Sequence, residues 1–318
     1  MSAVIQPRTP QRHRRWSRNV RHEAISGWLF ALPFTLAFIL VFIIPIISAV
    51  RSAFYDTQSV GGGLYGGGGR TEVFVGLKNF VNAATDTRFW NGIGRVMLFG
   101  VIQIPVMIVV ALALALVLDS FLVRRPGAWR LMYFLPFAIP GIIAAIVWTN
   151  LYLPGLSPFA GHFPDIGGNS FFFAPRVVLL SMANITTWTY TGYNMLIFLA
   201  ALQAIPTELY EAARIDGASG WDISRKIKIP LVRGAALLAV LLSIIGTVQL
   251  FNEPSMMSTV ANWMGKDYMP MQMAYGSLMG QVTPSGTGPA SAISILMALV
   301  AGALAVIYAL SQRRISNE

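Results

Sequence analysis

The chain has 318 residues, of which 55% are hydrophobic and only 11% are charged, and its mean hydropathy is +0.61. Soluble globular domains carry charge on about a quarter of their residues, so this composition excludes an ordinary soluble domain. The lack of cysteine excludes disulfides, thiolate metal sites and cysteine catalysis, and the formal net charge of +10 has to be interpreted by its placement along the chain.

Apolar runs of about twenty residues, each long enough to cross a bilayer, recur along the chain. They predict six transmembrane helices, at 27–50, 96–118, 131–153, 177–202, 235–250 and 290–310. The first run follows an arginine-rich tail and is too long for the core of a signal peptide, so we interpret it as a retained anchor. We therefore expect an all-α polytopic membrane protein with a tail at 1–26, a transmembrane domain at 27–314 and a tail at 315–318.

The basic residues lie mainly on one side of these spans. That side carries the N-terminal tail, the segment after the second span, the segment 206–233 and the C-terminal end, with examples at Arg12, Arg125, Lys226 and Arg313. By the positive-inside rule, both termini and the segment 206–233 are predicted to be cytoplasmic. The basic excess is thereby explained by topology and lipid contact, and nucleic-acid binding is not predicted.

The segment between the first two spans contains two glycine runs, at 61–63 and 66–69. A phosphate-binding loop is not predicted there, because Gly69-Arg70-Thr71 lacks the lysine and Leu64 replaces the required glycine. We expect a flexible surface loop, followed by a short structured cap at 74–90. The histidines at 13, 22 and 162 are scattered without ligand spacing, so neither a metal site nor a catalytic site is predicted.

Polar and aromatic side chains concentrate in the fourth span and continue in the fifth. Polar groups facing lipid are unfavourable, so these side chains are expected to face the bundle interior or a pathway. A sugar site needs amide and hydroxyl partners beside aromatic rings, and this mixture is supplied by Trp188, Tyr190, Tyr193, Asn194, Ser243, Thr247, Gln249 and Asn252. The alternative is that they only join helices or belong to the interfacial belt.

The polar segment 206–233 has the signals of two short helices around a glycine. Pro206 and Thr207 open the first helix, and Gly217 supplies a left-handed cap. Ser219 offers an N-cap with Asp222 three residues later, and Pro230 is expected to end the second helix. We interpret the segment as a docking elbow for another protein, with an amphipathic loop without a partner as the alternative.

The same segment carries a named signature. Its residues Glu211, Ala212, Ala213, Asp216, Gly217 and Ala218, with Ile227 to Pro230 following, resemble the EAA loop of the membrane subunits of ABC importers. The runs Ile44-Pro45, 134–136 and 202–210 also follow in the order seen in carbohydrate-transporting ABC permeases. In the larger maltose permease subunit, a tyrosine that contacts the sugar matches Tyr193.

The resemblance implies a type I ABC importer permease fold and a permease subunit that imports a sugar across a bacterial or archaeal cytoplasmic membrane. It implies a second permease subunit, two ATPase subunits that use ATP and Mg, and an external sugar-binding protein. The chain itself is then no enzyme and binds no cofactor. A glycerol-phosphate or polyol permease stays open as an alternative, and so does a secondary carrier working alone, which predicts inverted repeats or an intramembrane charge.

Overall fold

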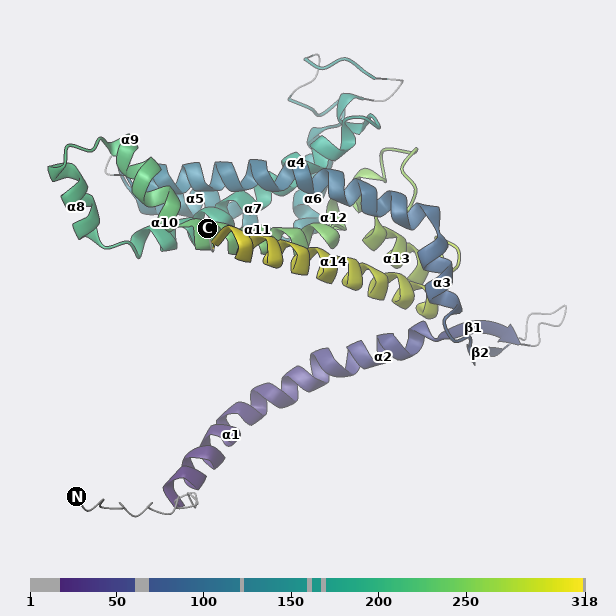
Figure 1. Ribbon diagram of the computed structural model, residues 1–318. Helices are drawn as coiled ribbons and strands as arrows, with labels where there is room; N and C mark the ends of the chain where they lie inside the picture. Colours follow the sequence, from purple (N-terminus) through teal and green to yellow (C-terminus); the bar gives the residue numbers. More distant parts are fainter. Residues whose placement is uncertain (1–17, 61–68, 121–122, 159–161, 167–169, 317–318) are drawn as a thin grey trace, which may run out of the picture. The chain divides into compact units, whose positions relative to one another are not determined.

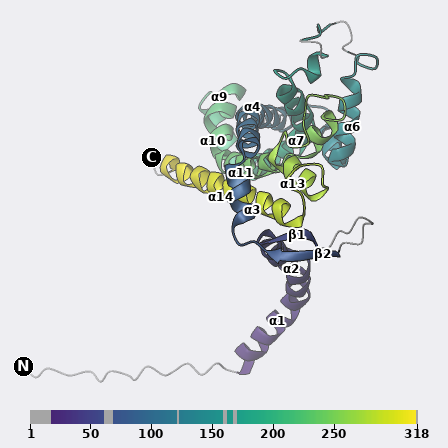
Figure 2. The ribbon, with the colours of Figure 1, turned by 90° about the vertical axis from the view of Figure 1, so that its right-hand side faces the viewer.

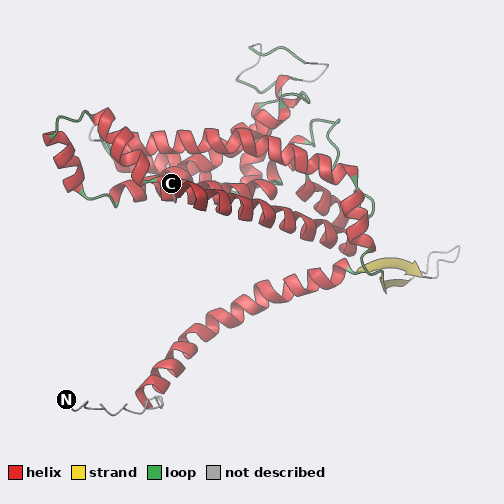
Figure 3. Cartoon of the chain, viewed as in Figure 1, coloured by secondary structure: helices red, strands yellow, loops and turns green. Residues whose placement is uncertain are grey.

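The computed structural model describes residues 18–60, 69–120, 123–158, 162–166 and 170–316. It divides into two compact units, Met1–Arg51 and Ser52–Glu318, which we describe separately. Its described residues are mainly helical, with one antiparallel hairpin (Figure 3).

The first unit is one long apolar helical path. It comprises α1 (Arg18–Phe38), a π-helical turn η1 (Ile39–Ile43) and α2 (Ile44–Ala53). The π turn comes directly before Pro45, which has no N–H and whose ring would meet the carbonyl four residues earlier in a regular α-helix. The Ile44 N–H bonds instead to the carbonyl of Ile39, five residues back, so the path continues through the proline.

The second unit opens with a hairpin that the sequence analysis does not predict. Strand β1 (Tyr55–Val60) pairs with β2 (Gly69–Phe74), with Tyr55 opposite Phe74 and their rings edge to face at 5.4 Å. Most of the glycine-rich loop lies outside the described residues, and Gly69 begins β2. Thr, Val, Tyr and Phe in these strands favour extended structure, but runs of six residues give too weak a pattern to separate them from a loop.

The helices of the second unit follow in the order seen in Figure 1. They are α3 (Lys78–Thr85), α4 (Thr87–Leu118), α5 (Pro126–Ala138), α6 (Gly141–Leu151), the short 3-10 turn η2 (Phe171–Phe173), α7 (Val178–Gln203), α8 (Thr207–Ile215), α9 (Gly220–Ile223), the π turn η3 (Ser224–Lys228), α10 (Ile229–Leu231), α11 (Arg233–Val248), α12 (Asn252–Met257), α13 (Pro270–Leu278) and α14 (Thr287–Ser316). Over the described residues, four helices are long and apolar enough to span a membrane, and six spans result if each of two bent pairs counts once. The predicted all-α polytopic fold is confirmed.

The third span differs from the prediction of one continuous helix at 131–153. Helices α5 and α6 meet at an angle of 93°. Ile139 and Pro140 lie between them, and Ile139 is extended (φ −79°, ψ 131°) because proline disfavours the helical conformation in the residue before it. The span is therefore broken, and α6 runs in a new direction.

Helices α4, α7, α11 and α14 form the body of the unit, and Figure 2 shows it turned by 90°. Helix α4 packs against α7 and α11, α5 packs against α7, and α14 packs against α11 and α13. At one end of the bundle lie α8 to α10, and at the other lie α3 and α13 (Figure 1). A Cβ at Gly192 on α7 would collide with the carbonyl oxygen of Tyr133 on α5, so this glycine permits their close approach.

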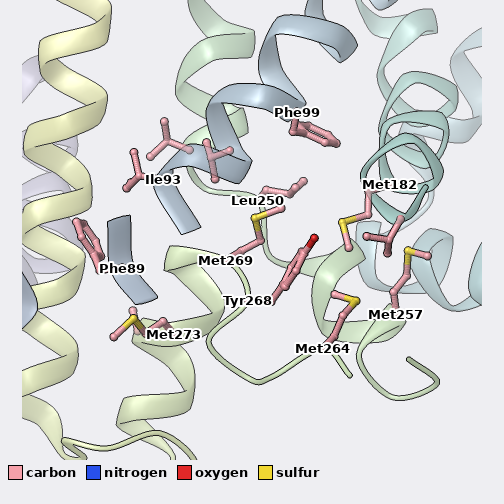
Figure 4. Close-up of a cluster of buried hydrophobic side chains, with 14 of the residues drawn as sticks. Phe89, Ile93, Phe99, Met182, Leu250, Met257, Met264, Tyr268, Met269 and Met273 are labelled. Carbon is pink, nitrogen blue, oxygen red and sulfur yellow. The ribbon is translucent and has the colours of Figure 1, made fainter. Parts of the chain in front are cut away.

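The core at the α13 end is rich in methionine. Met182, Met257, Met264, Met269 and Met273 are buried together with aromatic rings from α4 (Figure 4). An unbranched thioether side chain adapts to irregular gaps, which suits a core assembled from short helices and turns.

Candidate functional site

A central cavity of about 190 Å³ lies between α4, α7, α11 and α12. Seven of the eight residues predicted to line a pathway are brought together there: Tyr190, Tyr193, Asn194, Ser243, Thr247, Gln249 and Asn252. Residues far apart in the sequence thus converge on one space, as their polarity within apolar spans predicts.

Trp188 is the predicted residue that the structure places elsewhere. The cavity-lining residues of α7 are Thr186, Tyr190, Tyr193 and Asn194, which follow the i, i+4, i+7, i+8 spacing of one helical face. Trp188 falls two residues after Thr186 and so points to a different side, where its ring meets Trp148 of α6 edge to face at 5.7 Å. Trp188 therefore does not line this cavity, because its selection for a substrate pathway used polarity without the helical period.

The polar groups of the cavity are held by hydrogen bonds to their own helices. The Ser243 hydroxyl donates to the carbonyl of Ala239 at 2.7 Å, and the Asn194 amide donates to the carbonyl of Tyr190 at 3.0 Å. These bonds use the donors and fix the side chains, which leaves oxygen lone pairs for a ligand. The cavity thus offers oriented acceptors.

Glu253 contributes a buried carboxylate to the cavity wall. Its side chain is 6% exposed, and the Thr186 hydroxyl lies 3.3 Å from its Oε1 atom. The contact connects α7 with α12. A carboxyl group in this position can accept hydrogen bonds from ligand hydroxyls.

Tyr193 is positioned as an aromatic platform. Its ring stacks on Phe137 of α5 at 4.7 Å with an interplanar angle of 19°, and Phe137 also meets Tyr190 edge to face at 5.8 Å. The close approach of α5 to α7 at Gly192 makes this stacking possible. Since Tyr193 also lines the cavity, its ring combines a fixed support with a surface available to a ligand.

Some cavity residues were not selected from the sequence. Gln103 on α4 is 2% exposed and donates to the Met107 sulfur at 3.3 Å, and Phe99 and Phe251 supply further aromatic surface. Gln103 is a polar residue inside an apolar run, so the rule that selected Asn194 also applies to it. Phe99 and Phe251 have no such signal, because aromatic residues are common throughout the spans.

The elbow, defined as residues 206–233, has the predicted local geometry. Gly217 has φ +81°, the Ala218 N–H bonds to the carbonyl of Ala213 at 2.9 Å and the Gly217 N–H bonds to the carbonyl of Arg214 at 3.0 Å. This pair of bonds is a Schellman motif that ends α8 after Asp216. Ser219 and Asp222 then form a capping box that begins α9.

The elbow exposes apolar side chains outside the spans. Ile215 is 86% exposed and Trp221 is 71% exposed, and they lie on either side of the Gly217 turn. Glu211 and Ala212 on α8 are also exposed, whereas Ala213 is half-buried. Large apolar side chains beside charged residues on such a turn are typical of a protein-docking surface.

A half-buried ion pair joins the elbow to the bundle. Lys228 Nζ lies 2.6 Å from Asp119 Oδ2, with the two side chains 13% and 16% exposed, and 5.2 Å from the centre of the Tyr210 ring. Asp119 is the C-cap of α4, the helix that carries Phe99, Gln103 and Met107 in the cavity wall. Lys228 therefore connects both arms of the elbow to a cavity helix.

Pro230 does not end the second elbow helix, contrary to the prediction. The π turn η3 precedes it, and the Ile229 N–H bonds to the carbonyl of Ser224, five residues back. The helical path then continues through α10 to Val232, and α11 begins at Arg233. The wider turn accommodates the proline ring, as η1 does before Pro45.

Membrane-spanning helices, a central polar cavity and a protruding capped elbow define a helical membrane permease. The residues 83–317 match the family described as "Binding-protein-dependent transport system inner membrane component", and the chain belongs to this family. The family is a transport component of the membrane and not an enzyme.

Several relatives and solved structures resemble the chain. It is 32% identical over 240 residues to the lactose transport system permease protein LacF of Rhizobium radiobacter, covering 73% of this chain and 76% of the relative. It is 30% identical over 181 residues to the trehalose/maltose transport system permease protein MalF of Thermococcus litoralis, covering 56% and 61%. A chain of a bacterial alginate ABC transporter, solved with a periplasmic protein bound to an alginate pentasaccharide, shares the fold with a TM-score of 0.71 at 17% identity, covering 94% and 97%.

Proposed function

We propose that this chain is one permease subunit of an ATP-driven importer that carries a sugar across the cytoplasmic membrane. The observation that supports this proposal is the central cavity, where an aromatic platform, amides and hydroxyls come together from α4, α7, α11 and α12. Sugars present hydroxyl groups at their edges and weakly apolar C–H faces, and this lining matches both. The relatives named for lactose and for trehalose and maltose support the same class of substrate.

The charge of the cavity favours a neutral sugar over a phosphorylated one. Among the described residues that line it, Glu253 is the acidic residue and no Lys or Arg is present. A phosphate site requires cations or convergent N–H donors, and the described lining supplies no cationic side chain. The glycerol-phosphate alternative is therefore disfavoured by the cavity itself.

The size of the cavity supports a second permease subunit. Small-molecule sites commonly have volumes of about 300–1,000 Å³, and the central cavity holds about 190 Å³. A similar subunit facing this one would supply the opposite wall. An external sugar-binding protein would deliver the substrate, in keeping with the family description and with the binding protein in the alginate complex.

The elbow is proposed to receive one of two cytoplasmic ATPase subunits, which use ATP and Mg. Glu211, Ala212, Ala213, Asp216, Gly217 and Ala218 shape its turn, and Ile215 and Trp221 offer apolar contact area. The Lys228–Asp119 ion pair would transmit the movement of the elbow to α4. Both termini lie on the same cytoplasmic side in this arrangement, as the placement of basic residues indicates.

The test measures uptake of labelled lactose, maltose and trehalose into proteoliposomes that contain the whole complex and its binding protein. Tyr193→Ala removes the platform and is expected to lower uptake about tenfold, equivalent to about 1.4 kcal/mol of lost aromatic contact. Phe137→Leu removes the support behind the ring but no cavity-lining group, and is expected to lower uptake less than Tyr193→Ala does.

Assembly and basal ATP hydrolysis are expected to survive in Tyr193→Ala, because the elbow is separate from the cavity. Equal losses of uptake and assembly in both variants would show that Tyr193 only packs helices. Absence of ATP-dependent uptake of every sugar by the wild-type complex would refute the proposed function.

A further inference from the structure

Helix α3 carries an exposed apolar strip at the end of the bundle that lies away from the elbow (Figure 1). Leu77, the N-cap of the helix, is 63% exposed, and Val81 is 56% exposed. With the exposed Ala84 they follow the i, i+4, i+7 spacing of one helical face. These three residues, which we call the α3 strip, form a continuous apolar surface on the outside of the unit.

The other sides of α3 differ from the strip. Asn79 and Ala83 form its buried side, at 3% and 5% exposure. A third side is polar and exposed, and it consists of Lys78, Asn82 and Thr85. A short helix with an exposed apolar side next to an exposed polar side suits the boundary between membrane and water, where each side meets its own solvent.

The contacts of Asn79 place α3 at the level where membrane spans end. The Asn79 amide donates to the carbonyl of Ala53, the last residue of α2, at 3.0 Å, and to the carbonyl of Tyr55 at 2.9 Å. A Cβ at Gly288, in the first turn of α14, would collide with the same Tyr55 carbonyl oxygen. The apolar run of α14 begins two residues later, so α3 lies beside the outer end of this span.

Trp90 joins the α3 strip to the exposed side of α4. Its indole Nε1 atom donates to the carbonyl of Ala84 at 2.7 Å, and the side chain is 51% exposed. Leu98, Val101 and Val109 lie on the same helical face of α4 and are 53%, 73% and 65% exposed. Apolar side chains this exposed within a membrane span face lipid, so the strip continues a lipid-facing surface.

The depth of Trp90 agrees with this placement. Arg95 is the last charged residue before the apolar run 96–118 of α4. Trp90 comes five residues earlier, which is about 7.5 Å along a helix axis. The polar zone of a bilayer extends about 5–8 Å beyond each side of the hydrocarbon core, and tryptophan is enriched there.

We propose that the α3 strip and Trp90 bind the lipid bilayer at the boundary between headgroups and acyl chains, in the leaflet away from the elbow. In the proposed orientation this is the outer leaflet. Leu77 and Val81 enter the apolar edge of the leaflet, while Lys78 remains in water. Phospholipid fits better than a protein partner, because the strip lies at interfacial depth and continues the lipid-facing side of α4.

The test uses single cysteines that carry a nitroxide spin label, because the chain has no cysteine of its own. Leu77→Cys and Val81→Cys report on the strip, and Lys78→Cys and Asn82→Cys, each one residue further along, are the matched controls. The complete complex is placed in lipid nanodiscs, and a complex with the unsubstituted chain gives the background. Electron paramagnetic resonance then measures collisions of each label with oxygen, which enters the bilayer, and with a nickel chelate, which stays in water.

The ratio of oxygen to nickel collisions should be at least about threefold higher at positions 77 and 81 than at positions 78 and 82. Equal ratios at positions 81 and 82 would show that the strip lies in water and would overturn the proposal. A label at position 81 that is shielded from both reagents, with or without added binding protein, would show that protein covers the strip and would overturn it as well. Nanodiscs expose both leaflets and the measurement requires no sugar, so its outcome is independent of the proposed function.

Discussion

Replacing Lys228 with methionine should destabilise the attachment of the elbow to the bundle. The Lys228–Asp119 distance of 2.6 Å corresponds to a Coulomb attraction of about 6 kcal/mol at an effective dielectric constant of about 20, before the cost of desolvation. Removing one partner of a buried ion pair typically costs about 3–5 kcal/mol because the other charge is left unpaired. Both side chains keep some contact with solvent, at 13% and 16% exposure. We therefore expect Lys228→Met to lower the free energy of unfolding by about 3 kcal/mol, the lower end of this range.

The assay is equilibrium unfolding in mixed detergent micelles, together with the sugar-stimulated ATPase rate of the complex. The chain provides a matched control in Lys226, whose pair with Asp222 is at 2.8 Å but is 72% and 37% exposed. Lys226→Met should lower the stability far less than Lys228→Met, because exposed ion pairs contribute little. Exchanging the charges in Asp119→Lys with Lys228→Asp should recover part of the loss. Equal stabilities of Lys228→Met and Lys226→Met would refute the reasoning.

Gly217→Val should impair uptake and ATPase coupling without preventing membrane insertion, because φ +81° costs a branched side chain about 1–2 kcal/mol; normal uptake by this variant would contradict the elbow assignment. The chain has no cysteine, so Ser219→Cys should react with an impermeant maleimide only from the cytoplasmic side and Ser285→Cys only from the outside; the reverse result would invert the topology. Hydrogen bonds from Lys226 and Ser219 lower the pKa of Asp222 from 3.8 to about 2, so the capping box should be fully present above pH 3.8 and lost as the pH falls through about 2. A carboxyl titration by NMR with its midpoint at or above 3.8 would count against this.

The elbow was predictable in detail because its structure is local. Gly217, Ser219 and Asp222 act on backbone groups within a few residues, so the Schellman motif and the capping box can be read from spacing alone. The prediction that Pro230 ends the second helix was wrong because the structure around this proline is not determined locally. The π turn before it depends on how the elbow joins α11, and a proline in sequence indicates a break without indicating how the chain accommodates it.

The membrane spans were predictable as apolar runs, but their shape was not. Hydropathy located the apolar runs that form the four long helices and the two bent pairs, but it does not show that the third run is divided at Pro140 into two helices at 93°. The short strands of the hairpin lacked a pattern strong enough to identify them.

Cavity residues were predictable where polarity and helical period agree. Tyr190, Tyr193 and Asn194 satisfy both conditions, and Trp188 fails the second. Phe251 lines the central cavity through the tertiary arrangement of α11 and α12, which no feature of its own segment indicates.

The measurement that tests the central claim most directly is ATP-dependent sugar accumulation by the reconstituted complex with Asn194→Leu. This change keeps the size of the side chain and removes its oxygen from the cavity. The account predicts that the complex assembles and hydrolyses ATP, while accumulation of the sugar that the wild type transports falls at least tenfold. Accumulation equal to that of the wild type would show that the sugar does not pass through this cavity.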